Sequence, residues 1–246
     1  MDFEKAFTYI SEDEAWLKKL LVGAILGAVP FVNFAIFGYQ AQIARNVAAG
    51  EKRPLPDWGD FGQFFMDGLR LMGAFFVYSL PMILLVFIAA GSMIIFAGSA
   101  NQGYDAYGDP ASPAFFLIFG LMFACLMPYM FLLYALWPMF GIQIAREGTI
   151  GSCFRLSEMW RLIRAQIVNY LLILALLFGL YMVMTFIMLP AYLLMFIPCL
   201  GYIAYMVIYG GMMMLVMLVI GHLQGQFISE DNAQMETASD FTPETW

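Results

Sequence analysis

The side chains best suited to chemistry in this sequence are uncharged amides and one histidine, all near the ends of long apolar runs. They are Gln40, Gln42, Gln143, His222, Gln224 and Gln226. Amides at the ends of membrane helices hydrogen-bond to one another or to a small polar ligand. A single histidine without a carboxylate or thiol nearby is more typical of a helix end than of a metal site. We predict that these residues form a polar rim cluster, and hydrogen bonding between helices is the simpler interpretation of it.

The sequence lacks the patterns that mark common catalytic and cofactor sites. It contains no P-loop, no H-E-x-x-H and no serine nucleophile motif. The cysteines Cys125, Cys153 and Cys199 are scattered singly, which supports neither a disulfide framework nor a zinc site. We therefore predict no catalytic residue, no bound metal and no cofactor, and a protein that is not an enzyme.

The composition identifies the class of protein. Of the 246 residues, 63% are hydrophobic and only 12% are charged, whereas soluble domains have about 25% charged residues. The composition thus excludes a soluble fold, and with it intrinsic disorder and nucleic-acid binding. We predict an all-α polytopic transmembrane helical bundle in which residues 1–246 form a single integral membrane domain. Residues 1–19 would be an acidic N-terminal segment, 20–228 the membrane body and 229–246 an acidic tail.

Five apolar segments are each long enough to cross a bilayer, which takes about 20 residues. They are Leu20–Ala44, Leu71–Ala97, Pro113–Ile144, Ile167–Ile197 and Tyr202–Phe227. None contains a charged residue, and Pro198 to Gly201 predicts a tight turn between the last two. In the first segment, Pro30 and Asn33 leave two alternatives open. It is either one Pro-kinked spanning helix or a broken, re-entrant segment, and we favour the broken form.

The basic residues predict the orientation, because short loops rich in Lys and Arg stay in the cytoplasm. All 11 lie within residues 5–19, 45–70 and 146–164, and the loop from Gly98 to Ser112 has none. We expect that loop outside and the C-terminus in the cytoplasm of a prokaryotic inner membrane. A broken first segment places all 11 inside, whereas a spanning one leaves three outside.

Two cytoplasmic stretches have apolar residues at helical spacing. One follows the helix-start pair Pro56-Asp57, and the other includes Cys153, Leu156 and Ile163. From these two amphipathic helices we expect interfacial anchors at Trp58, Phe61, Phe65, Trp160, Arg161 and Arg164. A brace between spans is the simpler interpretation of these helices, and a gate or docking platform is the alternative.

A tetrapeptide recurs 101 residues apart in the chain. Gln42-Ile43-Ala44-Arg45 and Gln143-Ile144-Ala145-Arg146 each end an apolar segment and precede a stretch that contains a tryptophan. The shared context predicts an internal duplication of a helix–amphipathic–helix unit. Parallel repeats of this kind occur in transporters, but also in membrane proteins that transport nothing.

An ordered series of short motifs resembles a known family. The motifs are Trp16–Gly23, Val29–Asn33, Phe37–Tyr39, Arg45–Val47, Gly50–Asp60, Asp67–Leu69 and Tyr78–Pro81. Together they are similar to the prokaryotic multi-pass membrane family called domain of unknown function 4013, most specifically over residues 10–85. The resemblance implies an inner-membrane helical protein without an assigned activity. It also implies that Gly38-Tyr39, Leu55-Pro56-Asp57-Trp58 and Asp67-Gly68 are the characteristic positions of the family.

Two functions from different classes are compatible with these observations. We favour a non-catalytic scaffold or accessory subunit that interacts with other membrane proteins. The alternative is a small transporter or channel for an apolar or zwitterionic solute. Residues 229–246 contain five acidic and no basic side chains, which predicts a tail that is disordered alone and that contacts a basic surface of a partner. The expected partners are the lipid bilayer, another membrane protein and a second copy of the chain.

Overall fold

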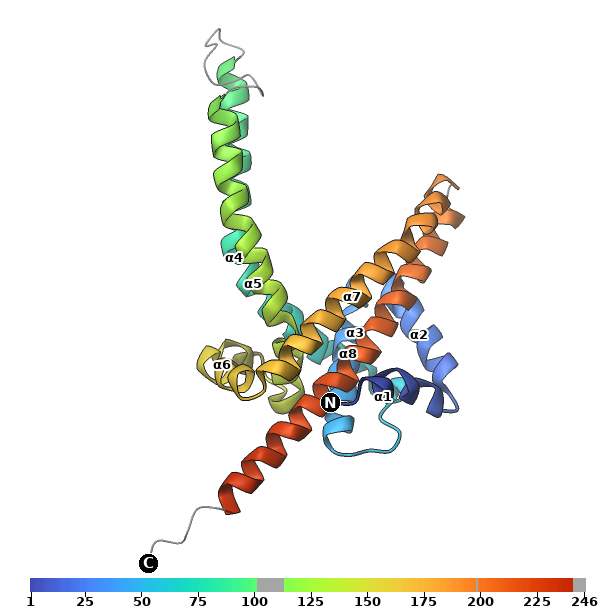
Figure 1. The fold of residues 1–246 in the computed structure, drawn as a ribbon. Coiled ribbons are helices and arrows are strands. Elements are labelled where there is room, and N and C mark those ends of the chain that lie inside the picture. Colours follow the sequence, from blue (N-terminus) through green and yellow to red (C-terminus); the bar gives the residue numbers. More distant parts are fainter. Residues whose placement is uncertain (101–112, 198, 241–246) are drawn as a thin grey trace, which may run out of the picture. The chain divides into compact units, whose positions relative to one another are not determined.

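The computed structural model describes residues 1–100, 113–197 and 199–240, and every regular element in these ranges is a helix (Figure 1). The α-helices are α1 Phe3–Thr8, α2 Trp16–Ala28, α3 Phe34–Ala48, α4 Phe61–Ala100, α5 Pro113–Glu147, α6 Leu156–Ala165, α7 Ile167–Ala191 and α8 Leu200–Asp240. The 3-10 helices are η1 Tyr9–Glu12, η2 Trp58–Asp60, η3 Ile150–Phe154 and η4 Tyr192–Phe196. The all-α prediction is confirmed.

Four helices in the described ranges are long and apolar enough to cross a membrane. Their qualifying parts are Trp58–Ser92, Phe119–Glu147, Ile167–Phe196 and Leu200–Thr237. These parts belong mainly to α4, α5, α7 and α8. The prediction of a membrane helical protein is therefore confirmed, whereas five spanning segments are not, because the first apolar segment contains no helix of sufficient length.

The first apolar segment is broken close to Pro30. α2 ends at Ala28, α3 begins at Phe34, and Phe31 between them has a positive φ of 67°. The two helices have 13 and 15 residues, or about 20 and 22 Å, which is short of the roughly 30 Å of bilayer hydrocarbon. Both pack against α8. The segment has the form of the re-entrant alternative and not of a single kinked helix.

The N-terminal residues lie beside the C-terminal half of α8. The backbone N–H of Asp2 donates to Oε1 of Gln226 at 2.6 Å, and Nε2 of Gln226 donates to the Asp2 carbonyl at 2.9 Å. Further along, the Tyr9 hydroxyl donates to the Leu218 carbonyl at 2.9 Å. These contacts hold the N-terminal residues against α8, the helix against which α2 and α3 also pack.

The first of the two predicted amphipathic helices needs correction. After η2 the chain enters α4 at Phe61 and remains helical for 40 residues to Ala100. No proline separates the amphipathic residues 61–69 from the apolar run that begins at Leu71, so one helix continues through both. The second stretch does form a helix of its own, α6, which only Gln166 separates from α7.

The predicted hairpin between the last two apolar segments is confirmed. η4 ends at Phe196, α8 begins at Leu200, and Cys199 in the turn has a φ of 61°. The rings of Tyr192 and Tyr205 pack across the hairpin with centroids 5.3 Å apart. Figure 1 shows α7 and α8 side by side from this turn onward.

The outer loop and the tail were also predicted from the sequence. In the loop from Gly98 to Ser112, residues 101–112 are not among the residues that the structure describes. The tail is not unstructured over its first part, because α8 continues through residues 229–240. The side chain of Asp231 is buried against the protein, which explains why the helix extends beyond the apolar run.

The chain divides into two compact units. The first contains the residues up to Ala74 and those from Pro138 onward, and the second is Phe75–Trp137, which includes the C-terminal part of α4 and the N-terminal part of α5. Within the second unit, Phe75 meets Trp137 edge to face at 5.4 Å, and the Tyr129 hydroxyl donates to the Tyr78 carbonyl. All charged side chains in the described ranges belong to the first unit, so the polar contacts below lie there.

Candidate functional site

Lys19, in the first turn of α2, is buried and uses all three of its N–H donors. Its Nζ lies 2.8 Å from Oδ2 of Asp13 and 3.1 Å from Oδ1 of Asp57. It also donates to the Leu55 carbonyl at 2.8 Å. Since an ammonium group has only three donors, Lys19 ties the N-terminal segment to the loop before α4 and has no donor left for a ligand.

The pKa values of this pair show a structural ion pair. Burial acts to raise the pKa of Asp13, but hydrogen bonds from Lys19 and from the Ala15 N–H outweigh it and lower that pKa from its usual 3.8. Burial acts to lower the pKa of Lys19, but its pairing with Asp13 and Asp57 raises that pKa from its usual 10.5. Both groups stay charged at neutral pH, so neither is suited to proton transfer.

Tyr39 and Trp58 complete the same cluster, which we call the Lys19 clasp (Asp13, Lys19, Tyr39, Asp57 and Trp58). The two rings stack with centroids 4.4 Å apart. The Tyr39 hydroxyl donates to the Pro56 carbonyl at 2.8 Å, and Nε1 of Trp58 donates to the Lys19 carbonyl at 3.0 Å. The clasp therefore joins α2, α3 and the loop before α4.

The backbones of α3 and α4 touch directly beside the clasp. A Cβ on Gly38 would overlap the Phe64 carbonyl, and a Cβ on Gly68 would overlap the Phe34 carbonyl. Only glycine fits at such a crossing. The positions that the family resemblance singled out thus meet in one place, and their role there is to pack helices together.

Asp67 of α4 is the centre of a second ionic cluster. Its side chain is 2% exposed, and its two oxygens lie 2.6 Å from Nη1 of Arg45 and 2.6 Å from Nη1 of Arg70. Arg45 also donates to the carbonyls of Ile144 at 2.8 Å and Ala145 at 3.1 Å, in the last turn of α5. A guanidinium is favoured at this negative end of a helix dipole. The first repeated tetrapeptide therefore contacts the second one directly.

Arg146, the equivalent arginine of the second tetrapeptide, pairs with a residue of α8. Its Nη1 lies 3.1 Å from Oδ2 of Asp231, whose side chain is 3% exposed. A cavity of about 350 Å³ adjoins both arginines and is lined by Arg45, Ala48, Ala49, Ala145, Arg146, Ile228 and Asn232. The C-terminal ends of α3 and α5 border it, and their dipoles disfavour anions. The arginines here neutralise helix ends and buried acids, and the cavity is poorly suited to a phosphate.

The predicted polar rim cluster separates into smaller groups. Nε2 of Gln40 donates to Oε1 of Gln224 at 2.9 Å, and Nε2 of Gln224 donates to the Pro138 carbonyl at 2.8 Å. A second pair, Gln226 and His222, has its side-chain nitrogens 3.0 Å apart. The structure thus brings Gln40 and Gln224 together across α3 and α8, as interhelical hydrogen bonding requires.

Gln42 and Gln143, the equivalent residues of the two tetrapeptides, stand apart from these pairs. Nε2 of Gln42 donates to Asn46 within α3 at 2.8 Å, and its Oε1 accepts from Arg45 at 3.1 Å. Gln143 is fully buried, and neither of its amide atoms has a hydrogen-bond partner. It is the polar side chain in the described structure that packing explains least.

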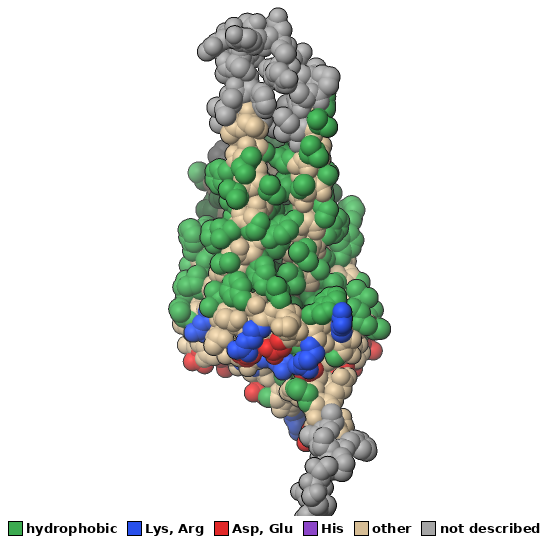
Figure 2. Space-filling view, turned by 90° about the vertical axis from the view of Figure 1, so that its left-hand side faces the viewer, with side chains coloured by type: hydrophobic (Ala, Val, Ile, Leu, Met, Phe, Trp, Pro, Cys, Tyr) green, Lys and Arg blue, Asp and Glu red, His purple; other side chains and the backbone are tan. Residues whose placement is uncertain are grey.

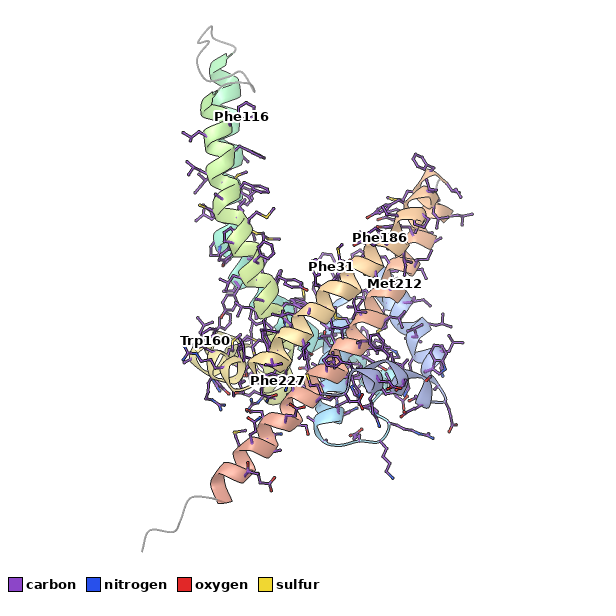
Figure 3. The ribbon with its side chains drawn as sticks, viewed as in Figure 1. Phe31, Phe116, Trp160, Phe186, Met212 and Phe227 are labelled. Carbon is purple, nitrogen blue, oxygen red and sulfur yellow. The ribbon has the colours of Figure 1, made fainter. Side chains whose placement is uncertain are left out.

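The predicted interfacial anchors fall into two classes. Trp58 is half-buried in the Lys19 clasp, and Phe61 and Phe65 stack on each other at 6.2 Å along α4, where Phe64 is the buried residue. Trp160, Arg161 and Arg164 of α6 are exposed, and Figure 3 labels Trp160 on this helix. The buried face of α6 is Met159, Leu162 and Ile163, so the expected apolar face is rotated and leaves Trp160 and Leu156 outside.

A third feature, missing from the sequence-based prediction, is the crossing of α3 and α8. A Cβ on Gly221 would lie 2.8 Å from the Gln40 carbonyl oxygen, and one on Gly225 would lie 2.7 Å from that of Ala44. The spacing Gly221-x-x-x-Gly225 is typical of closely packed membrane helices. This glycine spacing could therefore have predicted the close crossing of α3 and α8 from the sequence.

The described residues offer little for metal or nucleophilic chemistry. In the ranges 1–100, 113–197 and 199–240, no three His, Cys, Asp or Glu side chains are grouped so that they could hold a metal ion. Cys125 and Cys199 are exposed, whereas Cys153 is buried, and burial raises the pKa of its thiol to about 11. A thiol of that pKa is a poor nucleophile at neutral pH.

Comparison with known proteins bears on the family. No curated protein and no solved structure matches the chain. The family model described as "Protein of unknown function (DUF4013)" matches residues 22–193, which include the Arg45–Asp67 cluster and all of α4, α5 and α6. The match begins within the residues 10–85 on which the resemblance was strongest and continues far beyond residue 85. The chain belongs to the DUF4013 family.

Proposed function

We propose that this protein is a non-catalytic membrane scaffold or accessory subunit that binds other membrane proteins. The observation that carries the proposal is the pairing of its buried charged groups within the chain. Lys19 and Asp67, the buried charges with the most contacts, are satisfied by neighbours in the same chain. Groups that are committed to holding helices together are poorly placed to act on a substrate.

The apolar surface of the second unit supports the same proposal. In the most apolar 18 residues of Phe119–Glu147, only 6% of the residues are buried. In the most apolar 18 residues of Trp58–Ser92, the buried share is 17%. A pair of helices presents apolar side chains on nearly all sides, and such a surface accepts either lipid or the helices of another membrane protein. The first unit has an apolar pocket of its own, of about 360 Å³, between η1, α7 and α8.

The tail supplies the second proposed contact with a partner. Glu230 accepts from Asn169 at 2.6 Å, and Asp231 pairs with Arg146, so these two acids belong to the folded unit. The acids at the far end of the tail, Asp240 and Glu244, are the candidates for a basic partner surface. We place them in the cytoplasm, because an inner-membrane protein with its Lys and Arg inside would have this end inside as well.

The test is purification of the full-length protein from native membranes in mild detergent, with quantitative mass spectrometry of the proteins and lipids recovered. We expect a membrane protein at stoichiometric yield. A chain that ends at Asn232 keeps Asp231 and loses the outer acids, so it should recover less of that partner. Recovery of the protein alone with a bound small molecule would overturn the scaffold proposal, and equal recovery with both chains would exclude the tail as the contact.

One observation favours the alternative, a transporter or channel for a zwitterionic solute. A buried amide without partners, as in Gln143, usually costs stability and is compatible with a site for a small polar group. The variant Gln143→Leu decides between the two. If the amide only packs, the variant should be at least as stable as the wild type. If it binds a solute, the variant should lose solute uptake in proteoliposomes while remaining folded.

A further inference from the structure

The position of α6 in the chain places it at the level where a membrane span begins. Gln166 is the only residue between α6 and α7, and α7 begins a stretch that is long and apolar enough to cross the bilayer. Both Ile167 and Val168 are exposed at its start. A helix joined so closely to a span must lie near the headgroups of the lipids around that span.

The orientation of α6 about its own axis follows from its buried face. Met159, Leu162 and Ile163 anchor it to the first unit. Leu156, Trp160 and Arg164 follow at i, i+4 and i+8 and so form one row along the helix. Leu156 is 54% and Trp160 53% exposed. This row is the side of α6 that is free to meet lipid.

Only one of the three arginines on this surface is paired with acidic side chains of the described residues. Arg155 is occupied by Glu147 at 2.6 Å and Glu158 at 3.5 Å. Arg161 and Arg164 have no ion-pair partner among the described residues, and the guanidinium carbon of Arg164 lies 4.8 Å from the centroid of the Trp160 ring. Figure 2 shows charged side chains gathered next to hydrophobic ones on the face of the molecule that includes α6.

We propose that Arg161, Arg164 and Trp160 form a binding site for the anionic headgroup of a phospholipid. A guanidinium donates to phosphate oxygens in a paired geometry, and a tryptophan is favoured at the boundary of headgroups and hydrocarbon. The apolar Leu156 beside them accommodates the start of an acyl chain, which free phosphate lacks. The site thus discriminates between lipids by headgroup charge, a property that does not depend on the scaffold role.

The experiment is native mass spectrometry of the full-length protein in detergent, titrated with phosphatidylglycerol and with phosphatidylcholine. The test variant is Arg161→Gln/Arg164→Gln. Its matched control is Lys52→Gln/Arg53→Gln, which removes the same charge from exposed residues of the loop before α4. We expect the wild type and the control to prefer phosphatidylglycerol by about tenfold, since each basic residue near an anionic surface adds affinity. The test variant should show no such preference.

Three results would overturn the proposal. One is an unchanged preference in the test variant, and another is an equal loss in the control, which would indicate charge without a site. The third is displacement of the lipid by millimolar inorganic phosphate, which would indicate a free-anion site. A thermal melt of each variant accompanies the titration, and Arg161→Lys/Arg164→Lys, which keeps the charge, should retain part of the preference.

Discussion

A buried carboxylate is stable only where opposite charges face it, and Asp67 is such a residue. Two guanidinium groups contact its oxygens, and one of them, Arg45, is held in turn by carbonyls of α5. Each member of the cluster therefore depends on the others, and loss of one leaves a charge that water reaches poorly.

Replacement of this carboxylate should destabilise the protein strongly. In Asp67→Asn, Arg45 and Arg70 would lose the carboxylate between them, and since both arginines are partly exposed, the cost is at most that of a fully buried pair, about 3–5 kcal/mol. We expect a clear fall in the melting temperature of the detergent-solubilised protein, measured by scanning fluorimetry. Asp60→Asn, at an exposed position of the same region, is the control and should melt like the wild type. Equal melting of the two variants would show that the ion pairs around Asp67 contribute little.

The Lys19 clasp predicts a pH dependence. The folded-state pKa of Asp13 lies below its usual 3.8, so its ion pair stabilises the protein above that pH and is lost as the pH falls through the folded-state value. We expect Asp13→Asn to be less stable than the wild type at pH 7. The two melting temperatures should converge as the pH falls below 3.8 and through the folded-state pKa of Asp13, and a constant difference at all pH values would contradict the role of the charge.

The sequence singled out the arginines of the two tetrapeptides but did not predict which carboxylates pair with them. The repeated tetrapeptides drew attention to Arg45 and Arg146, but only as signs of orientation. Their partners Asp67 and Asp231 lie 22 and 85 residues further along the chain. A carboxylate in a polar stretch has no sequence signal for burial, so its pairing became visible only in three dimensions.

Among the elements, α3 is the one that other helices approach most closely. Gly38 and Gly68 bring α4 against it, and Gly221 and Gly225 bring α8 against it. Contacts of this kind replace the hydrophobic effect, which does not act between helices within lipid. The packing of α3 should therefore be sensitive to single methyl groups.

The variant Gly225→Ala tests that sensitivity. Its Cβ would lie 2.5 Å from the Cβ of Val47 and 2.7 Å from the Ala44 carbonyl oxygen, and overpacking of this kind costs about 1–3 kcal/mol. We expect a lower melting temperature. Gly179→Ala in α7, where a Cβ would meet nothing within 4 Å, should be neutral or slightly stabilising. If Gly225→Ala melts like Gly179→Ala, α3 and α8 are not closely packed at Gly225.

The boundaries of the elements were predictable wherever a backbone constraint marked them. Pro30 lies in the break between α2 and α3, and Pro198 to Gly201 marked the α7–α8 turn. The start of α4 was predicted near Asp57, but its continuation was missed because the amphipathic pattern changes at Leu71 without any helix breaker. When a helix passes from the interface into lipid, the pattern of its hydrophobic residues changes, but the helix itself can continue.

The whole molecule has a sidedness that can be measured. If all four candidate spans cross the membrane and the first segment is re-entrant, both ends of the chain lie on one side and the α7–α8 turn on the other. Lys and Arg are absent after Arg164, which agrees with an outer position of that turn. The exposed Cys199 is a natural probe for it.

We expect a membrane-impermeant maleimide to label Cys199 in intact cells. Gly59→Cys, at an exposed position before α4, should be labelled only after the membrane is opened. Both proteins would have serine at positions 125 and 153, and the second also at position 199, so that each reports on one thiol. Labelling of position 59 but not of position 199 in intact cells would reverse the orientation proposed here.

The order of α2, α3 and α8 along the chain has a consequence for biosynthesis. α2 and α3 are made early, yet the helix against which both pack is made only after α4, α5, α6 and α7. Likewise, about 100 further residues must be translated after Arg45 before the α5 carbonyls that it binds are made. Until α8 is inserted, two short helices and their ionisable side chains lack their final partners at the membrane surface. The nascent chain is therefore most vulnerable to proteases before α8 has been translated, and a chain that stops at the α7–α8 turn should be degraded rather than accumulate.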